Sequence, residues 1–377
     1  MHPITIIGSG LAGYTLAREI RKLDKDVTIR IITADAGYFY SKPMLSNALD
    51  KKLSIEKLTT FTAQQMAEQH NLEIVNHCQV QQIDTQHKQL LTDSGIYPYS
   101  QLVLANGAQA IRIPLKGDAT DSIISVNSLD DYAQFTEQLK SAKHVSIMGA
   151  GLIGCEFAND LCNAGYQVTL IDLADRPLGR LLPDKAAASL KDKLSNLGIE
   201  WQLNHSVQTV NHIDSKLEIT LDDESSFTTD LVLSAIGLRA DTHLAKSAGL
   251  EVNRGVVVNE YLRTSMDSIY ALGDCMEING SVLPFVMPIM IGARALAQTL
   301  TGNATEVVYP AMPVVVKTPA QPTVVCPPPV GTEGEWQETV TESGVKACFY
   351  QGDKLMGFAL TGDAITEKQQ LVKQMDS

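Results

Sequence analysis

Glycine residues with the spacing of a dinucleotide-binding turn occur at two places in the chain. The two sets are Gly8, Gly10 and Gly13, and Gly149, Gly151 and Gly154. In such a turn the first glycine permits the tight bend, the second lets the backbone approach a pyrophosphate, and the third lets the following helix pack on the strand. Each turn should therefore hold phosphate groups at the positive N-terminus of a helix.

A carboxylate completes the second of these patterns. An apolar strand over residues 145–148 enters the turn, a helix follows to about residue 163, and a second strand ends at Asp172. A carboxylate at this place accepts hydrogen bonds from a ribose diol and repels a 2′-phosphate, so Asp172 favours NADH over NADPH. Two nucleotide sites in one chain predict two cofactors that exchange electrons.

The elements around these turns predict an α/β fold with two Rossmann-like dinucleotide-binding domains, the second inserted in the first, and a small C-terminal α+β domain. Residues 1–112 and 235–309 should form the first domain and residues 113–234 the second. The prolines and short β-branched runs after residue 310 indicate an ordered domain over residues 310–377.

Composition narrows the function. The net charge of −13 argues against binding to nucleic acid or to an anionic membrane surface. No apolar run approaches the roughly 20 residues that span a bilayer, which predicts a cytoplasmic protein without membrane insertion. The six cysteines contain no CxxC or CxxxxC pair, and the eight histidines have no ligand spacing, so neither a redox-active dithiol nor a metal site is expected.

Several segments carry a specific resemblance. The turn 8–13, LVLANGA at 102–108, the unit at 149–154 and SIYALGDC at 268–275 resemble the FAD/NAD(P)H oxidoreductases with two dinucleotide folds. The segments ITAD, YSKPMLSNAL, GAGLIGCEFANDL, LSAIGLR, PFVMPIM and MPVVVKTPA are most similar to the rubredoxin–NAD reductases of alkane-oxidising bacteria. The resemblance covers essentially the whole chain.

The resemblance implies FAD and NADH as cofactors and a set of residues that bind them. On the FAD side these residues are Gly8, Ser9, Gly10, Leu11, Ala12, Gly13, Thr33, Ala34, Asp35, Lys42, Val80, Glu156, Asp274, Val286 and Lys317. On the NADH side they are Gly149, Gly151, Gly154, Asp172 and Gly237. A helix over residues 288–300 should aim its N-terminus at the N1/O2 edge of the flavin, where reduced flavin carries negative charge.

Lys42 and Glu156 are the expected catalytic pair. Lys42 precedes Pro43 on an ordered loop, and Glu156 lies just past the second glycine turn. In the family's arrangement, hydride passes from NADH C4 to flavin N5 and the lysine stabilises developing charge and relays a proton. The glutamate orients the lysine and steers the nicotinamide. The alternative is a buried salt bridge with a purely structural role.

The absence of a dithiol predicts direct electron transfer to an external acceptor, and the resemblance implies rubredoxin, which would serve a membrane alkane hydroxylase. A flavorubredoxin reductase for nitric oxide or oxygen detoxification remains a close alternative, and a ferredoxin reductase is less favoured because the C-terminal domain is short and proline-rich. An NADH oxidase or peroxidase is disfavoured because residues 1–77 contain no cysteine. A non-catalytic flavin-binding sensor is a further alternative. Residues 1–60 carry three more basic than acidic side chains. This excess is either an ordinary fluctuation of charge over solvated faces or a basic surface around Lys51, Lys52 and Lys57 that would suit an acidic partner.

Overall fold

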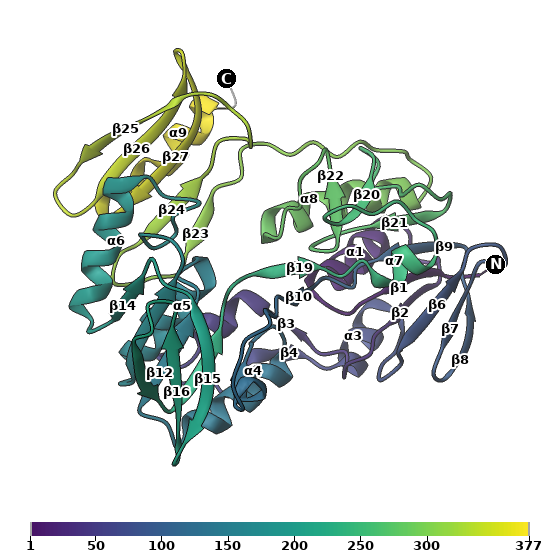
Figure 1. Ribbon diagram of the computed structural model, residues 1–377. Helices are drawn as coiled ribbons and strands as arrows, with labels where there is room; N and C mark the ends of the chain where they lie inside the picture. Colours follow the sequence, from purple (N-terminus) through teal and green to yellow (C-terminus); the bar gives the residue numbers. More distant parts are fainter. Residues whose placement is uncertain (1, 376–377) are drawn as a thin grey trace. The chain divides into compact units, whose positions relative to one another are not determined.

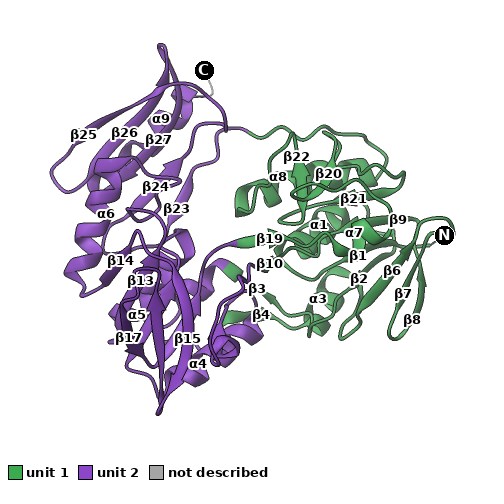
Figure 2. Ribbon diagram, in the orientation of Figure 1, with its two compact units in different colours: residues 1–42, 56–109, 238–309 green, residues 43–55, 110–237, 310–377 purple. Residues whose placement is uncertain are grey.

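The structure, a computed structural model, describes residues 2–375, which form two compact units (Figure 2). Unit 1 contains residues 1–42, 56–109 and 238–309, and unit 2 contains residues 43–55, 110–237 and 310–377. Residues 1, 376 and 377, at the ends of the predicted first and C-terminal domains, lie outside the described residues. Among residues 2–375 no helix is both long enough and apolar enough to cross a bilayer.

Unit 1 is built on a parallel sheet with the strand order β21-β9-β1-β2-β5. The strands are β1 (Ile4–Ile7), β2 (Ile29–Ile32), β5 (Glu73–Val75), β9 (Gln101–Leu104) and β21 (Ile269–Ala271). All four residues of β1 are buried, because both faces of a parallel sheet are covered. The covering helices include α1 (Leu11–Leu23) and α8 (Val286–Leu300), which pack against each other (Figure 1).

The remaining elements of unit 1 surround this sheet. An antiparallel three-stranded sheet is formed by β6 (Val80–Asp84), β7 (Gln89–Thr92) and β8 (Gly95–Pro98). Three short pairs are β3 (Phe39–Tyr40) with β4 (Thr59–Phe61), β10 (Ala108–Ala110) with β19 (Leu238–Ala240), and β20 (Val256–Val258) with β22 (Met276–Ile278). Further helices are α2 (Ile55–Leu58), α3 (Ala63–His70) and α7 (His243–Ser247).

Unit 2 repeats the parallel architecture around β12, with the strand order β11-β18-β12-β13-β14. The strands are β11 (Ile123–Ile124), β12 (His144–Met148), β13 (Gln167–Asp172), β14 (Glu200–Leu203) and β18 (Leu231–Ser234). Its helices are α4 (Leu129–Leu139), α5 (Leu152–Asn163) and α6 (Asp184–Asn196), and an antiparallel meander consists of β15 (Val207–Ile213), β16 (Lys216–Leu221) and β17 (Ser226–Thr229). The two parallel sheets confirm the predicted pair of Rossmann-like folds.

The C-terminal region of unit 2 forms an antiparallel sheet with the order β23-β24-β27-β26-β25. Its strands are β23 (Val314–Val316), β24 (Thr323–Cys326), β25 (Glu335–Val340), β26 (Val345–Gln351) and β27 (Lys354–Thr361), and α9 (Lys368–Met375) packs against β27 (Figure 1). This arrangement confirms the α+β prediction. Helix α6 packs against β25, β26 and β27, so the region shares one compact unit with the second nucleotide fold. Its treatment as a separate domain stays a prediction.

Two local boundaries differ from expectation. The segment Lys42–Asn47, expected as a loop, is a 3-10 helix, because proline is compatible with the first positions of a helix. Helix α8 starts at Val286 rather than at Pro288, which places the proline in the first turn, where its missing N–H is not needed.

Candidate functional site

In the first glycine turn, open space lies beside Gly10, where a pyrophosphate is expected, and Gly8 and Gly13 are in close contact with the backbone. A Cβ atom on Gly8 would lie 2.3 Å from the Ala105 carbonyl oxygen, and one on Gly13 would lie 2.0 Å from the Gly8 carbonyl oxygen. A Cβ on Gly10 would meet nothing within 4 Å. Gly10 also caps α1 without a side-chain hydrogen bond, so the first amides of the helix remain available to an anion.

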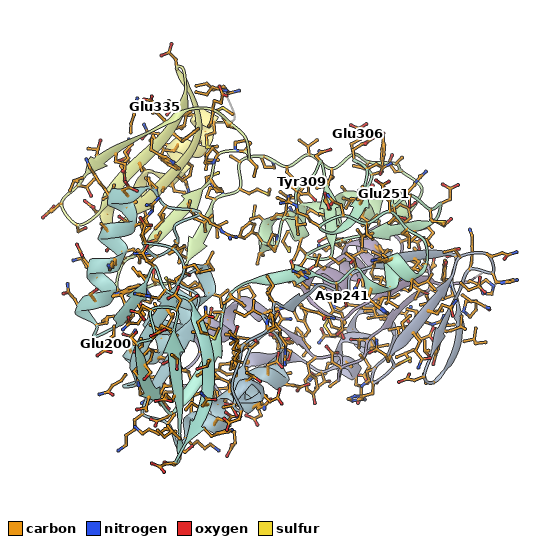
Figure 3. The ribbon with its side chains drawn as sticks, viewed as in Figure 1. Glu200, Asp241, Glu251, Glu306, Tyr309 and Glu335 are labelled. Atoms are coloured by element: carbon orange, nitrogen blue, oxygen red, sulfur yellow. The ribbon has the colours of Figure 1, made fainter. Side chains whose placement is uncertain are left out.

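The turn after β9, residues 105–108, packs against the first glycine turn. Gly107 adopts φ +74°, a backbone conformation that favours glycine. The Asn106 Nδ2 donates to the backbone oxygen of Asp241 at 2.9 Å, and the Asp241 amide donates to the Gly107 oxygen at 3.0 Å; Asp241 is labelled in Figure 3. Two hydrogen bonds to the backbone of Asp241 therefore hold the Ala105–Ala108 segment.

Several of the residues predicted to bind FAD gather at the end of β2. Asp35 Oδ1 accepts hydrogen bonds from Ser9 Oγ (3.0 Å), Thr33 Oγ1 (2.8 Å) and the Gly37 amide (2.8 Å). Ser9 comes from the glycine turn, so the carboxylate is fixed next to it. The Cys78 amide donates to the Thr33 carbonyl at 2.9 Å, which brings the start of β6, at Val80, to the same edge of the sheet.

The turn after β21 brings Asp274 toward the same helix N-termini. A Cβ on Gly273 would lie 2.9 Å from the Ala12 Cβ and 3.8 Å from Ile289 Cγ1, so the turn packs between the first residues of α1 and α8. Burial raises the pKa of Asp274, and the positive charge of Lys42 opposes this shift. No side chain caps α8, and Val286 in its first turn is 41% exposed. These features fit the predicted polar end of a flavin.

The second glycine turn repeats the geometry of the first. A Cβ on Gly154 would lie 1.8 Å from the Gly149 oxygen, and one on Gly149 would lie 2.6 Å from the Ala235 oxygen. A Cβ on Gly151 would meet nothing within 4 Å, and no side chain caps α5 at this residue. The contact with Ala235 places Gly237, which adopts φ +116°, close to the turn.

Asp172 is fixed at the end of β13 by two amides. Its Oδ2 accepts from the Ala150 amide at 2.5 Å and its Oδ1 from the Ala174 amide at 2.7 Å. Each carboxylate oxygen can accept further hydrogen bonds, so the arrangement fits a ribose diol beside the glycine turn.

Glu156, on the first turns of α5, is fully buried and has partners that the sequence did not indicate. Its Oε2 accepts from the Ser46 hydroxyl at 2.5 Å and forms an ion pair with Lys317 Nζ, while its Oε1 accepts from the Lys317 amide at 2.9 Å. Ser46 is itself 3% exposed. The predicted action of Lys42 with Glu156 stays a prediction.

The cysteines nearest the two turns are held as thiols. Burial raises the pKa of the Cys155 thiol, and it raises the pKa of the Cys275 thiol to about 12. Among residues 2–375 no disulfide joins any of the six cysteines, and five of the six are buried. Buried, protonated thiols are poor nucleophiles, so Cys155 and Cys275 are poorly suited to act as redox-active thiols.

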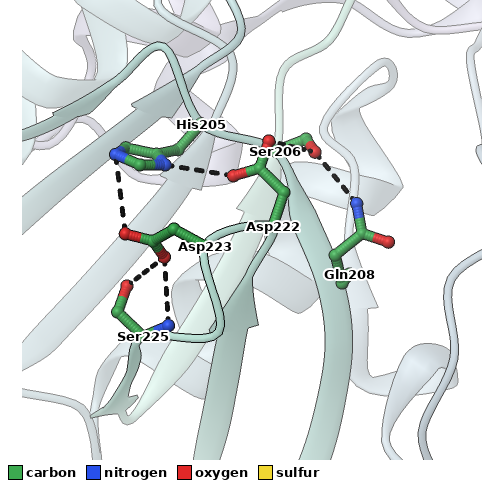
Figure 4. A network of polar contacts seen from close by, with 6 residues as sticks. All are labelled: His205, Ser206, Gln208, Asp222, Asp223 and Ser225. Carbon is green, nitrogen blue, oxygen red and sulfur yellow. Dashed lines mark hydrogen bonds and ion pairs between the residues drawn. The ribbon is translucent and has the colours of Figure 1, made fainter.

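One group of possible metal ligands lies outside these sites within residues 2–375. Atoms of His205, Asp222 and Asp223 lie within 4.8 Å of one another (Figure 4). Asp222 accepts from His205 Nδ1 at 3.0 Å, and Asp223 accepts from the amide and the hydroxyl of Ser225 at 3.0 and 2.6 Å. Protein donors already occupy these exposed carboxylates, and nothing else at the site points to a metal ion.

Both turns have the geometry of dinucleotide-binding folds, and comparison with known proteins identifies the family. Residues 2–299 match the family model of the pyridine nucleotide-disulphide oxidoreductases, and residues 306–375 match that of the rubredoxin binding C-terminal domain. The chain belongs to the pyridine nucleotide-disulphide oxidoreductase family.

Its relatives are similar over their whole length. A rubredoxin-NAD(+) reductase of Alcanivorax borkumensis is 46% identical, with 100% of this chain and 99% of the relative covered. A protein of the same name from Acinetobacter baylyi is 48% identical, with coverages of 98% and 96%. A nitric oxide reductase FlRd-NAD(+) reductase of Vibrio vulnificus is 40% identical, with coverages of 99% and 98%.

The fold also resembles solved structures. The crystal structure of a covalent putidaredoxin reductase-putidaredoxin complex aligns with a TM-score of 0.90 at 23% identity, with 100% of this chain and 94% of that chain covered. At this identity the likeness describes the fold alone.

Proposed function

We propose that the chain is a rubredoxin–NAD(+) reductase: an FAD flavoprotein that takes hydride from NADH and passes single electrons to rubredoxin. The observation that carries this proposal is the combination of two nucleotide folds with a C-terminal region, residues 306–375, that matches the rubredoxin binding domain. The full-length similarity to two rubredoxin-NAD(+) reductases supports the same acceptor.

The two glycine turns divide the cofactors between the two units. FAD would lie over the turn 8–13, with its ribose near Asp35 and its flavin toward Asp274 and the start of α8. NADH would lie over the turn 149–154, with its ribose on Asp172. The open faces of Gly10 and Gly151 and the uncapped helices behind them support this assignment. Bound FAD supplies the conversion from a two-electron donor to a one-electron acceptor.

Lys42 and Glu156 remain the proposed catalytic residues. Glu156 is buried and accepts from three donors, which keeps its carboxylate in one position. The positive charge of Lys42 opposes the rise of the Asp274 pKa. Lys42 therefore acts at the end of unit 1 where we propose that the flavin lies. We propose that Lys42 stabilises negative charge that develops on the flavin and that Glu156 orients the nicotinamide.

We further propose that the acceptor rubredoxin serves a membrane alkane hydroxylase and that the reductase works in the cytoplasm. Burial raises the pKa of the Cys155 and Cys275 thiols, and protonated thiols suit a reducing compartment in which NADH is available. The second candidate is reduction of a flavorubredoxin, because a nitric oxide reductase FlRd-NAD(+) reductase is 40% identical over 99% of this chain.

The acceptor can be tested by steady-state NADH oxidation with rubredoxin, flavorubredoxin and ferredoxin compared at equal concentration. We expect the highest kcat/KM with rubredoxin, and a strong preference for NADH over NADPH because of Asp172. A higher kcat/KM with flavorubredoxin would favour the second candidate, and turnover with ferredoxin alone would contradict both.

A further inference from the structure

One face of α5 carries buried polar side chains where a core helix normally carries apolar ones. Glu156 and Asn159 are 0% exposed, and Asp160 is 3% exposed. Residues three and four apart lie on one face of a helix, so the three side chains form a continuous polar strip. Buried polar groups are stable only when they have partners, so this strip must be satisfied by neighbouring segments.

The first two residues of the strip hold the turn between β23 and β24. Glu156 accepts from the amide of Lys317 at 2.9 Å, and Asn159 Oδ1 accepts from the amide of Ala320 at 3.1 Å. Both amides belong to the region that matches the rubredoxin binding domain. Helix α5 therefore fixes the backbone of this region from the second nucleotide fold.

The third residue of the strip holds a different segment. Asp160 accepts from the amides of Leu49 and Asp50 at 2.9 and 3.1 Å. Burial raises the pKa of Asp160, and these two hydrogen bonds oppose the shift. Asp160 thus acts on residues 49–50, while Asn159 acts on the turn after β23.

The side chain of Asn159 contacts the turn after β23 through one hydrogen bond, so its role can be separated from those of Glu156 and Asp160. Its hydrogen bond to Ala320 uses Oδ1, and among the described residues its buried Nδ2 has no hydrogen-bond partner. A buried unpaired donor is unfavourable, so an apolar residue would suit this place better unless the acceptor oxygen were needed. The far side of the same turn is held by Gln321 Nε2, which donates to Ser189 Oγ at 2.7 Å.

We propose that Asn159 is a positioning residue for electron delivery to rubredoxin: it fixes the acceptor-domain turn at residues 318–321 to the helix that follows the NADH turn. The inference rests on the proposed function. Asn159 acts through the position of this turn and not on hydride transfer, so its loss should affect the two half-reactions differently.

The test compares Asn159→Ala with Asn163→Ala, the same change at an exposed position of the same helix. Each flavoenzyme is reduced anaerobically by NADH and then mixed with rubredoxin, or with ferricyanide, which needs no protein docking. For Asn159→Ala we expect reduction by NADH and turnover with ferricyanide within about twofold of the wild type. Reoxidation by rubredoxin should slow by about tenfold, equivalent to about 1.4 kcal/mol. Asn163→Ala should match the wild type in every step.

The conservative variant Asn159→Asp keeps an oxygen at the acceptor position and should recover part of the lost rate. An unchanged rubredoxin step in Asn159→Ala, or equal slowing with NADH, rubredoxin and ferricyanide, would overturn the inference in favour of a structural role. If Asn159→Ala fails to fold, hydrogen exchange of the wild-type holoenzyme decides: a protected Ala320 amide supports the contact, and exchange at the rate of an open loop overturns it. Failure of the wild type itself to reduce rubredoxin would instead contradict the proposed function, and the inference with it.

Discussion

The ion pair between Glu156 and Lys317 allows a quantitative test of the structure of unit 2. The Glu156 carboxylate is fully buried, and the Lys317 side chain is 24% exposed. In Lys317→Met the ammonium is lost, and the carboxylate keeps the Ser46 hydroxyl and the amide of residue 317 as donors. A buried carboxylate is thereby left without its counter-charge.

The expected cost follows from these contacts. Removing one partner of a buried ion pair costs about 3–5 kcal/mol. Two remaining donors and the partial exposure of Lys317 reduce this, so we expect Lys317→Met to lower the free energy of unfolding by about 2–3 kcal/mol. Once Glu156→Gln has removed the charge, adding Lys317→Met should cost little, which gives a coupling energy of about 2 kcal/mol.

Urea unfolding followed by tryptophan fluorescence suits this double-mutant cycle. Both tryptophans, Trp201 in β14 and Trp336 in β25, belong to unit 2, so the signal reports this unit. Lys193→Met, an exposed lysine on α6, is the matched control and should stay within about 0.5 kcal/mol of the wild type. A cost below about 0.5 kcal/mol for Lys317→Met, or additive costs in the double variant, would refute the reasoning.

Three further predictions concern the nucleotide sites and pH. Asp172→Ala should raise the KM for NADH about tenfold, a loss of about 1–2 kcal/mol, and reduce discrimination against NADPH; unchanged kinetics with both would contradict the ribose assignment. Gly154→Ala, whose Cβ would lie 1.8 Å from a carbonyl oxygen, should retain flavin but lose reduction by NADH. Gly13→Ala, whose Cβ would lie 2.0 Å from a carbonyl oxygen, should purify without flavin. Absorbance spectra check both variants, and normal flavin content with normal NADH reduction in both would count against the assignment of FAD to the first turn and NADH to the second. Burial alone would raise the pKa of Glu277, but hydrogen bonds from the Asn253 side chain and from the amides of residues 254 and 255 lower it. The Glu277 carboxylate therefore stabilises the fold above its unfolded pKa, and this stabilisation is lost as pH falls through the folded pKa. Glu277→Gln should be less stable than the wild type by about 1–2 kcal/mol at neutral pH and equally stable in acid. Thermal release of flavin measures the difference in stability, and a difference that does not change with pH would contradict the prediction.

The nucleotide turns were predictable because their chemistry is local in the sequence. Each glycine set is needed by its own strand, turn and helix, and a Cβ on Gly13 or Gly154 would collide with the same turn. The position of Asp172 was predictable for a similar reason, since the end of the second parallel strand lies beside the glycine turn.

The partners of Glu156 were not predictable, because they come from distant parts of the chain. Ser46 and Lys317 are separated from Glu156 by 110 and 161 residues, and no periodicity connects them. The family resemblance directed attention to Lys42 instead. Neither Ser46 nor Asn159 had a signal that separated it from an ordinary polar residue; only the packing of a helix between two remote segments identifies them.

The most direct test of the proposed function is a sequential anaerobic stopped-flow experiment on the purified flavoprotein, with NADH added first and oxidised rubredoxin second. We expect rapid bleaching of the flavin by NADH, slow bleaching by NADPH, and rapid return of the oxidised spectrum as rubredoxin is reduced. Rapid bleaching without reoxidation by rubredoxin would contradict the proposed acceptor, and absence of bleaching by NADH would contradict the assignment of unit 2 as the NADH site.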